Sequence, residues 1–238
     1  MGVIDRWAFR LRCRQRERTR RHHPVCGESA RALSAQREAW PTAARLSRPW
    51  EHERFVVLDT EATGLDHRAD RPVSLGAVTV VAGRIHLGDT FSRVLASEVL
   101  SSRTSVIVHG LTPDKVALGT PPHDALSDFL VWAGDAILVA HHASFDLAML
   151  NPTAVQLHGL PLQNLVLDTI HLARRVERDS GYDYDLDSLL QRFEISQSGN
   201  RHTALGDALL TARLLQRLLK HLKASGAVTL RDLALSPF

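Results

Sequence analysis

Cysteine, lysine and long apolar runs are scarce in this sequence of 238 residues. Cys13 and Cys26 are its only cysteines, which excludes a disulfide framework and favours a reducing compartment. No apolar run reaches the roughly 20 residues that a membrane helix needs. No apolar segment follows the N-terminal charges, and Arg6 stands where a myristoylation motif requires Ser or Thr. We therefore expect a cytoplasmic protein that does not span a membrane.

Charge is distributed unevenly along the chain, although the formal net charge is only +3. Residues 1–25 hold eight Arg against Asp5 and Glu17, a net +6, which leaves −3 for the rest of the sequence. Two interpretations of this basic segment stay open. It is either a solvated arm or an arm that contacts the phosphates of a nucleic acid.

Proline positions and composition divide the chain into three parts. We expect a basic extension and linker over residues 1–53, a globular domain over 54–224 and a short tail over 225–238. Within the extension, four side chains could in principle bind zinc, but their spacing matches no common zinc module. These are Cys13, His22, His23 and Cys26.

The most informative stretch is residues 55–65, which read FVVLDTEATGL. Four apolar residues run directly into Asp59, a pattern that predicts a short buried strand. If the strand continues to Glu61, its period of two places both carboxylates on one face. Two interpretations remain at this point: a solvated strand end, or half of a site for a hard cation such as Mg²⁺ or Mn²⁺.

The remaining pattern predicts an α/β fold with a mixed sheet. Residues 73–95 read as a β-hairpin, and residues 136–140 and 165–167 read as short buried strands. Apolar residues at helical spacing predict several helices. Their expected ranges are 121–133, 144–158, 169–176, 186–193 and 204–222, and a further short helix is expected to begin at Pro113 after Thr112 as its N-cap.

Two further acids follow these elements at positions that suit the same site. Asp146 lies in the first turn of a predicted helix, and Asp207 lies near the start of the last one, five residues after His202. Each has an ordinary explanation: an acid at a helix N-terminus is stabilised by the helix dipole, and a loop histidine is usually solvated. Together with Asp59 and Glu61 they could converge on the carboxyl edge of one sheet, where α/β proteins bind ligands.

Three segments carry a resemblance to a known family. D-T-E-A-T-G at 59–64, H-H-A-S-F-D at 141–146 and H-T-A-L-G-D at 202–207 resemble the motifs of the DEDDh 3′→5′ exonucleases, the family of the DNA polymerase III epsilon (proofreading) subunit. H-G-L-T at 109–112 is similar to that family's H-G-I-T segment. The resemblance spans residues 54–222 and implies a ribonuclease-H-like fold, with a mixed five-stranded sheet flanked by helices.

The resemblance also implies roles for individual residues. Asp59, Glu61 and Asp207 would bind one divalent metal ion, and Asp146 would help Asp59 to hold a second. The implied cofactors are thus two Mg²⁺ or Mn²⁺ ions per active site, with His202 as the general base. Five residues would shape the substrate pocket: Thr63, Gly64, Leu65, His109 and Phe145.

The expected function is 3′→5′ hydrolysis of single-stranded DNA with release of nucleoside 5′-monophosphates. The alternatives are an oligoribonuclease-like enzyme acting on RNA or short oligonucleotides, and a non-catalytic nucleic-acid-binding module. Ala62 and His142 depart from the usual family residues and bear on the choice between DNA and RNA. A DNA polymerase or sliding clamp is a further expected partner, although residues 233–238 read more simply as a packing tail than as a clamp-binding peptide.

Overall fold

The computed structural model describes residues 43–178, 181, 183–197 and 201–233. Several predicted features lie outside these residues. They are the basic arm, the four cysteine and histidine side chains considered for zinc, and all but the first residue of the segment 233–238.

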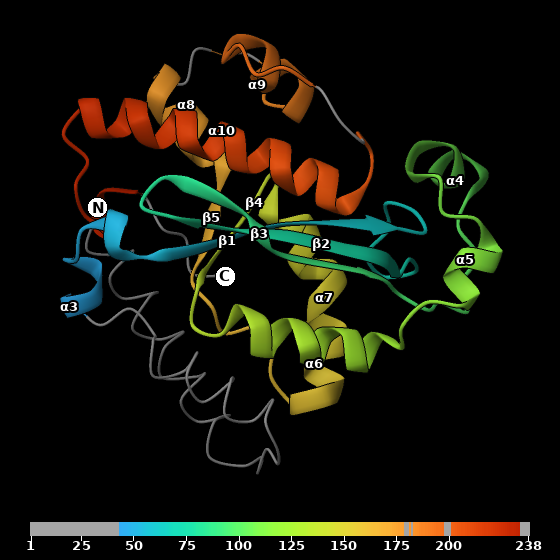
Figure 1. Ribbon diagram of the computed structural model, residues 1–238. Coiled ribbons are helices and arrows are strands. Elements are labelled where there is room, and N and C mark those ends of the chain that lie inside the picture. The colour runs from blue at the N-terminus through green and yellow to red at the C-terminus, as the bar shows by residue number, and fades with distance from the viewer. Residues whose placement is uncertain (1–42, 179–180, 182, 198–200, 234–238) are drawn as a thin grey trace.

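A five-stranded mixed sheet forms the centre of the fold, with the strand order β3-β2-β1-β4-β5 (Figure 1). β1 pairs antiparallel with β2 and parallel with β4, β2 pairs antiparallel with β3, and β4 pairs parallel with β5. The predicted mixed sheet is therefore confirmed. The strands are β1 (Arg54–Ala62), β2 (Pro72–Val81), β3 (Arg84–Val94), β4 (Ile137–Ala140) and β5 (Val166–Asp168).

Helices cover both faces of this sheet (Figure 1). On one face lie α8 (Thr169–Glu177), α9 (Leu186–Arg192) and α10 (Ala204–Ala224), and on the other lie α6 (Pro122–Ala133) and α7 (Ala143–His158). α4 (Arg103–His109) and α5 (Pro113–Ala117) project beyond one end of the sheet. The short elements are α3 (Ala43–Leu46), η1 (Trp50–His52) and η2 (Leu230–Leu233).

The alternation of β1 determines which way its acids face. Phe55 and Val57 pack into the core cluster that contains α10, whereas Val56 and Leu58 pack into the cluster that contains α6 and α7. Because side chains alternate along a strand, Asp59 and Glu61 lie on the α10 side. The carboxyl ends of β1, β4 and β5 meet at one edge, since these three strands are parallel.

Gly76 of β2 allows α10 to approach this edge closely. It pairs with Asp59 in the β1–β2 register, and a Cβ atom at this position would lie 2.1 Å from the backbone nitrogen of Leu205. Only a residue without a side chain therefore lets the first turn of α10 rest on the sheet beside Asp59. Asp207 sits in that first turn.

The segment before β1 packs against the segment after α10. Trp50 is buried in the α10 core cluster, its backbone N–H donates to Val228 O at 3.1 Å, and its indole N–H donates to Ala227 O at 3.1 Å. These contacts cross the predicted boundary between residues 53 and 54, and the domain limits stay a prediction. Of the helices described, none is both long and apolar enough to cross a bilayer.

Candidate active site

Three carboxylates from two elements meet at the carboxyl edge of β1. One oxygen from each of Asp59, Glu61 and Asp207 can be chosen so that all three atoms lie within 4.8 Å of one another. The strand supplies the first two acids, and the close contact at Gly76 brings α10 and the third beside them. An all-carboxylate oxygen donor set suits a hard divalent ion such as Mg²⁺ or Mn²⁺.

The electrostatics of this cluster show that it lacks sufficient positive charge of its own. Burial raises the pKa of Asp59 well above its usual range, and the neighbouring charges of Asp146, Glu61 and Asp207 raise it further. Burial and the charge of Asp207 raise the pKa of Glu61 to about 7. A bound divalent cation would remove this repulsion, because it favours the ionised form of each acid.

Asp146 reaches the same edge from the opposite layer. It is buried in the first turn of α7, and its Oδ1 accepts a hydrogen bond of 2.8 Å from the hydroxyl of Thr60. Burial raises the pKa of Asp146 to about 7, although the hydrogen bond from Thr60 opposes the shift. Asp146 thus faces Asp59 across β1 but does not belong to the three-carboxylate cluster.

Asp168 fixes the start of α7, and sequence reasoning assigned it no such role. Its carboxylate accepts hydrogen bonds from the backbone N–H groups of His142 at 3.2 Å and Ala143 at 2.9 Å. α7 begins at Ala143 rather than at the predicted Ser144, with His142 as its cap in the left-handed conformation, φ 62°. Histidine and asparagine tolerate this conformation better than most residues do.

His202 lies on the loop that leads into α10. Its backbone N–H donates to Oδ1 of Asp207 at 3.3 Å, and its φ of 59° is left-handed. Its side chain is exposed and makes no hydrogen bond to any residue that the structure describes. The loop therefore presents an imidazole to solvent next to the carboxylate cluster.

Arg201 is part of the site, although the sequence analysis did not single it out. Its guanidinium donates to Oδ2 of Asp207 and also to Oδ1 of Asp187 on α9, at 2.7 Å from Nη2. Burial lowers the pKa of Arg201, but its hydrogen bonds to Asp187 and Asp207 outweigh that effect and raise it overall. No sequence pattern indicated the bridge, because its partners lie 14 residues before and 6 residues after Arg201.

The five predicted pocket residues differ in exposure. Thr63 is buried, and its hydroxyl donates to Asp70 at 2.7 Å. Leu65 is 86% exposed, while Gly64 and Phe145 are half-buried. His109 is buried at the end of α4, where burial lowers its pKa and its Nδ1 accepts a hydrogen bond from Leu111 N–H at 3.0 Å. A contact with substrate stays a prediction for each of them.

The family model for exonucleases (RNase_T) matches residues 56–215, which include the four acids and His202. The chain belongs to this exonuclease family. Its class is that of the DnaQ-like 3′→5′ exonucleases, which are hydrolases, as the three motifs predicted.

Curated relatives of this exonuclease carry DNA polymerase III names. The DNA polymerase III subunit epsilon-like protein of Rhodobacter capsulatus is 37% identical over 189 residues, which is 79% of this chain and 27% of that protein. The PolC-type DNA polymerase III of Caldanaerobacter subterraneus is 32% identical over 179 residues, or 75% of this chain and 12% of that protein. The chain therefore spans only a small part of the length of these relatives.

Solved structures share the fold of the exonuclease. Exonuclease X in complex with 5′ overhanging duplex DNA has a TM-score of 0.60 and 24% identity, covering 76% of this chain and 96% of that chain. The nuclease domain of 3′hExo, a DEDDh family member bound to rAMP, has a TM-score of 0.63 and 16% identity, covering 78% and 97%. The predicted ribonuclease-H-like exonuclease fold is confirmed.

Proposed function

We propose that this exonuclease removes nucleotides from the 3′ end of single-stranded DNA with the help of two divalent metal ions, releasing nucleoside 5′-monophosphates. The observation that carries the proposal is the convergence of Asp59, Glu61 and Asp207 within 4.8 Å, with Asp146 on the far side of β1. Four acids at one sheet edge have no evident structural use, since their mutual repulsion opposes folding.

The acids divide into two groups according to their positions. Asp59, Glu61 and Asp207 would hold one ion, and Asp59 and Asp146 would hold the second, because Asp59 is the acid whose pKa is raised by all the others. When bound, such ions lower the pKa of a coordinated water and neutralise charge on the scissile phosphate. The carboxylates must be deprotonated to bind them.

His202 would accept the proton of the attacking water. An imidazole can do so near neutral pH, and its loop is held to Asp207 by the backbone hydrogen bond of 3.3 Å. Since the ring is exposed and makes no hydrogen bond within the described residues, it is free to turn toward a water above the carboxylates.

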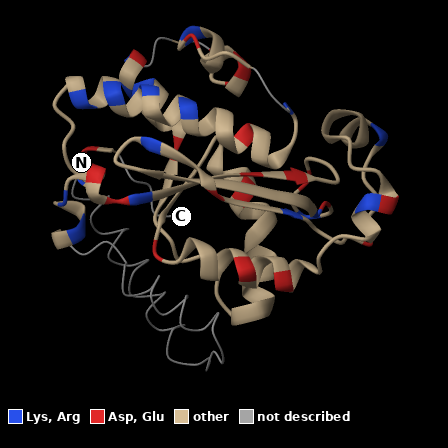
Figure 2. Ribbon diagram, viewed as in Figure 1, with Lys and Arg blue, Asp and Glu red and all other residues tan. Residues whose placement is uncertain are grey.

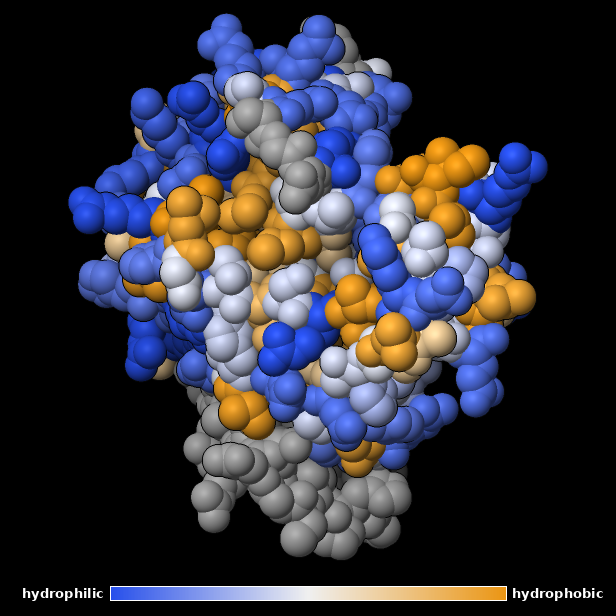
Figure 3. All heavy atoms as spheres, turned by 45° about the vertical axis from the view of Figure 1, so that its right-hand side comes forward, coloured by the Kyte–Doolittle hydropathy of each residue, from blue (hydrophilic) through white to orange (hydrophobic). Residues whose placement is uncertain are grey.

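Exposed apolar side chains on the loop after β1 and on α4 support a substrate with unpaired bases. A hydrogen bond joins these two segments, since the N-cap of α4, Ser102, donates its backbone N–H to Thr63 O at 2.9 Å. Leu65 is 86% exposed and Ile107 on α4 is 74% exposed. Figure 3 turns the side of the molecule with α4 and α5 forward and shows apolar patches on it, separated by polar side chains. Bases of a single strand are unstacked and can pack on such groups, whereas those of a duplex are not accessible.

Degradation of a 5′-labelled single strand tests the activity. A ladder of products that shorten from the 3′ end with Mg²⁺ or Mn²⁺, and that disappears with EDTA or in the Asp59→Asn variant, is the expected result. The same sequence as RNA, run in parallel, decides the substrate class. A folded protein that leaves both polymers intact would refute the proposal.

The role of His202 requires a separate measurement. His202→Ala should slow single-turnover cleavage by about 100-fold or more and leave the affinity for the strand nearly unchanged. We expect the rate of the wild type to rise with pH around neutrality, and His202→Ala should remove this rise. A variant that cleaves at the wild-type rate would exclude His202 as the base.

Association with a DNA polymerase or clamp is a proposal that rests on the names of the relatives. A pull-down with a purified sliding clamp, using the full chain and a chain shortened by residues 234–238, tests it. Binding that survives the shortening is the expected result, because residues 233–238 read as a packing tail, and no binding by the full chain would contradict the proposal.

A further inference from the structure

Arg201 connects α9 to the metal-binding carboxylates through a chain of ion pairs. Its Nε and Nη2 donate to Oδ1 of Asp187 at 3.0 and 2.7 Å, and its Nη1 donates to Oδ2 of Asp207. The other oxygen of Asp207 accepts the backbone N–H of His202. Both oxygens of Asp207 are therefore held by two consecutive residues of the loop that carries His202.

We infer that Arg201 is a positioning residue that serves as the internal counter-cation of the metal centre and anchors the His202 loop. This inference rests on the proposed function. The side chain of Arg201 is only 20% exposed. Its guanidinium contacts Asp207, and its charge favours the ionised forms of Asp59 and Glu61. A divalent ion at these carboxylates competes with Arg201 for the same negative charge.

Asp187 modulates this competition from outside the metal site. It lies in the first turn of α9, is 55% exposed and is not one of the candidate ligands. Because it shares the charge of the guanidinium with Asp207, its removal leaves that charge to Asp207 alone. Asp187 should therefore favour metal binding, and Arg201 should oppose it.

Titration of the full chain with Mn²⁺ in the absence of nucleic acid tests whether Arg201 weakens metal binding and whether Asp187 strengthens it. Arg201→Gln should bind Mn²⁺ roughly five-fold more tightly than the wild type, and Asp187→Asn should bind it more weakly. The double variant should match Arg201→Gln, because the effect of Asp187 passes through Arg201. A merely structural role would instead weaken metal binding when Arg201 is lost.

Arg231→Gln is the matched control, since it removes one exposed cation far from the acids along the chain and should leave the affinity unchanged. Wild-type affinity in all three variants would overturn the inference, and so would a weakening by Asp187→Asn that persists without Arg201. A wild type that binds no Mn²⁺ but degrades DNA only with added metal would also overturn it. A wild type inactive under every condition would refute the proposed function itself.

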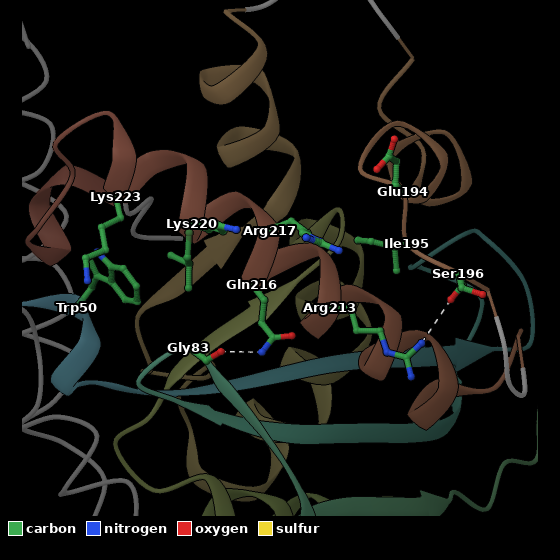
Figure 4. Close-up of a pocket in the computed structure, with 11 residues that line it drawn as sticks. Trp50, Gly83, Glu194, Ile195, Ser196, Arg213, Gln216, Arg217, Lys220 and Lys223 are labelled. Carbon is green, nitrogen blue, oxygen red and sulfur yellow. Dashed lines mark hydrogen bonds between the residues drawn. The ribbon is translucent and has the colours of Figure 1, made fainter.

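An independent observation concerns a pocket of about 540 Å³ along one flank of α10, where Gln216 donates to Gly83 O in the β2–β3 turn (Figure 4). Trp50, Ile195 and Leu219 line it as buried apolar groups. Its exposed charged groups include the cations Arg217 and Lys220 and one acid, Glu194. None of the four acids of the candidate active site lines this pocket. It is thus a second concave surface, formed by η1, the β2–β3 turn at Gly83, the segment that follows α9, and α10 itself.

The charge of α10 is unusually one-sided. After Asp207 the helix carries four cations and no acid (Figure 2), namely Arg213, Arg217, Lys220 and Lys223. Lys223 pairs with Glu51 at 2.7 Å and Arg213 donates to Ser196 O at 3.3 Å, whereas Arg217 and Lys220 make no hydrogen bond or ion pair within the described part of the chain. A solvated helix usually interleaves acids three or four residues from its cations.

The geometry points to this surface as a binding track for the phosphate backbone of the substrate strand, away from its 3′ end. Arg213 follows Asp207 by six residues, about 9 Å along the helix axis, and Lys223 lies about 24 Å from it. Along the helix axis, the exposed cations thus begin fewer than two turns after Asp207 and continue to the last turn of α10. Exposed cations in series, two of them without partners within the described part of the chain, suit the phosphates of a single strand.

The salt dependence of binding tests this track. With Ca²⁺ in place of the cofactor to slow cleavage, Arg217→Gln/Lys220→Gln should bind a long single strand more weakly. The slope of log affinity against log salt should become shallower by about 1.4, the value for two lost phosphate contacts. Arg231→Gln should leave the slope unchanged. An unchanged slope in the double variant would refute the track, whereas strand binding without any degradation would refute only the proposed function.

Discussion

At the scale of single residues, the ionised acids near the end of β1 lower the stability of the folded protein when no cation is bound. Burial and repulsion by neighbouring acids raise the pKa of Asp59 and raise that of Glu61 to about 7. Burial raises the pKa of Asp146 to about 7. Such groups favour folding below their unfolded pKa of about 4 and lose that contribution as the pH rises through their folded pKa. The metal-free protein should therefore become less stable as the pH rises from about 4 to about 7.

Metal should reverse this loss, and its effect on stability should depend on pH. We expect Mg²⁺ to raise the melting temperature more at about pH 8 than at about pH 5.5, because protons compete for the carboxylates at the lower pH. Thermal unfolding in EDTA and in Mg²⁺ at both pH values measures this increase in melting temperature. Asp59→Asn, which removes the most crowded acid, should abolish most of the difference. An equal Mg²⁺ effect at both pH values would contradict the prediction.

Thr60 keeps Asp146 ionisable, since its hydroxyl donates to the carboxylate at 2.8 Å. Thr60→Val preserves the shape but removes the donor, so the pKa of Asp146 should rise further. We expect kcat/KM near neutral pH to fall about five-fold and the acid limb of the pH–rate profile to move to higher pH. Thr60→Ser retains the hydroxyl and serves as the control. A profile of Thr60→Val that overlays the wild type would exclude this role.

At the scale of elements, the contact between β2 and α10 assembles the carboxylate cluster. A Cβ atom on Gly76 would lie 2.1 Å from Leu205 N and 2.3 Å from the carbonyl carbon of Ala204. Backbone atoms cannot yield as a flexible side chain can, so Gly76→Ala should push the first turn of α10, and Asp207 with it, away from Asp59.

Gly76→Ala should therefore lose both stability and metal affinity. We expect a loss of about 3 kcal/mol in the free energy of unfolding, together with weaker Mn²⁺ binding at a temperature where the variant is still folded. Gly88→Ala is a suitable control, because a Cβ atom there meets nothing within 4 Å. If Gly76→Ala were less stable but bound Mn²⁺ normally, the contact would not position Asp207.

At the scale of the whole molecule, hydrogen bonds join the segment before β1 to the segment after α10. Arg48 O accepts from Leu230 N–H at 3.1 Å, and Trp50 donates from its backbone and its indole to residues 228 and 227. Arg45 adds a buried ion pair with Glu53 at 2.8 Å. Residues 43–53 thus contribute to the core although they precede β1.

Truncated chains measure how much residues 43–53 add to the stability of the protein, separately from residues 1–42. A chain that begins at residue 54 should melt about 10 °C lower than one that begins at residue 43, since loss of a buried tryptophan alone costs about 3–5 kcal/mol. Thermal unfolding of both chains in Mg²⁺ measures it, with Trp50→Ala in the full chain as a comparison. Equal melting temperatures would support the predicted boundary at 53/54 as a true domain limit.

Much of this protein follows from its sequence, because the signals are local. The apolar run before Asp59, the hairpin over 73–95 and the leucine spacing of the last helix each predict their element through periodicity alone. The order of these elements requires a mixed sheet, and parallel strands must end at one edge. The three motif segments and their resemblance to a known family led us to expect the four acids and His202 at that edge, and the structure brings Asp59, Glu61 and Asp207 together there.

The tertiary structure decided what depends on partners distant in the chain. The start of α7 is fixed by Asp168 rather than by Ser144, and the bridge from Asp187 through Arg201 to Asp207 joins two helices across a loop. Likewise Gly76 reads as an ordinary strand residue until α10 is placed against it. Contacts of this kind produce no periodic pattern in the sequence, because each depends on how the whole backbone folds in space.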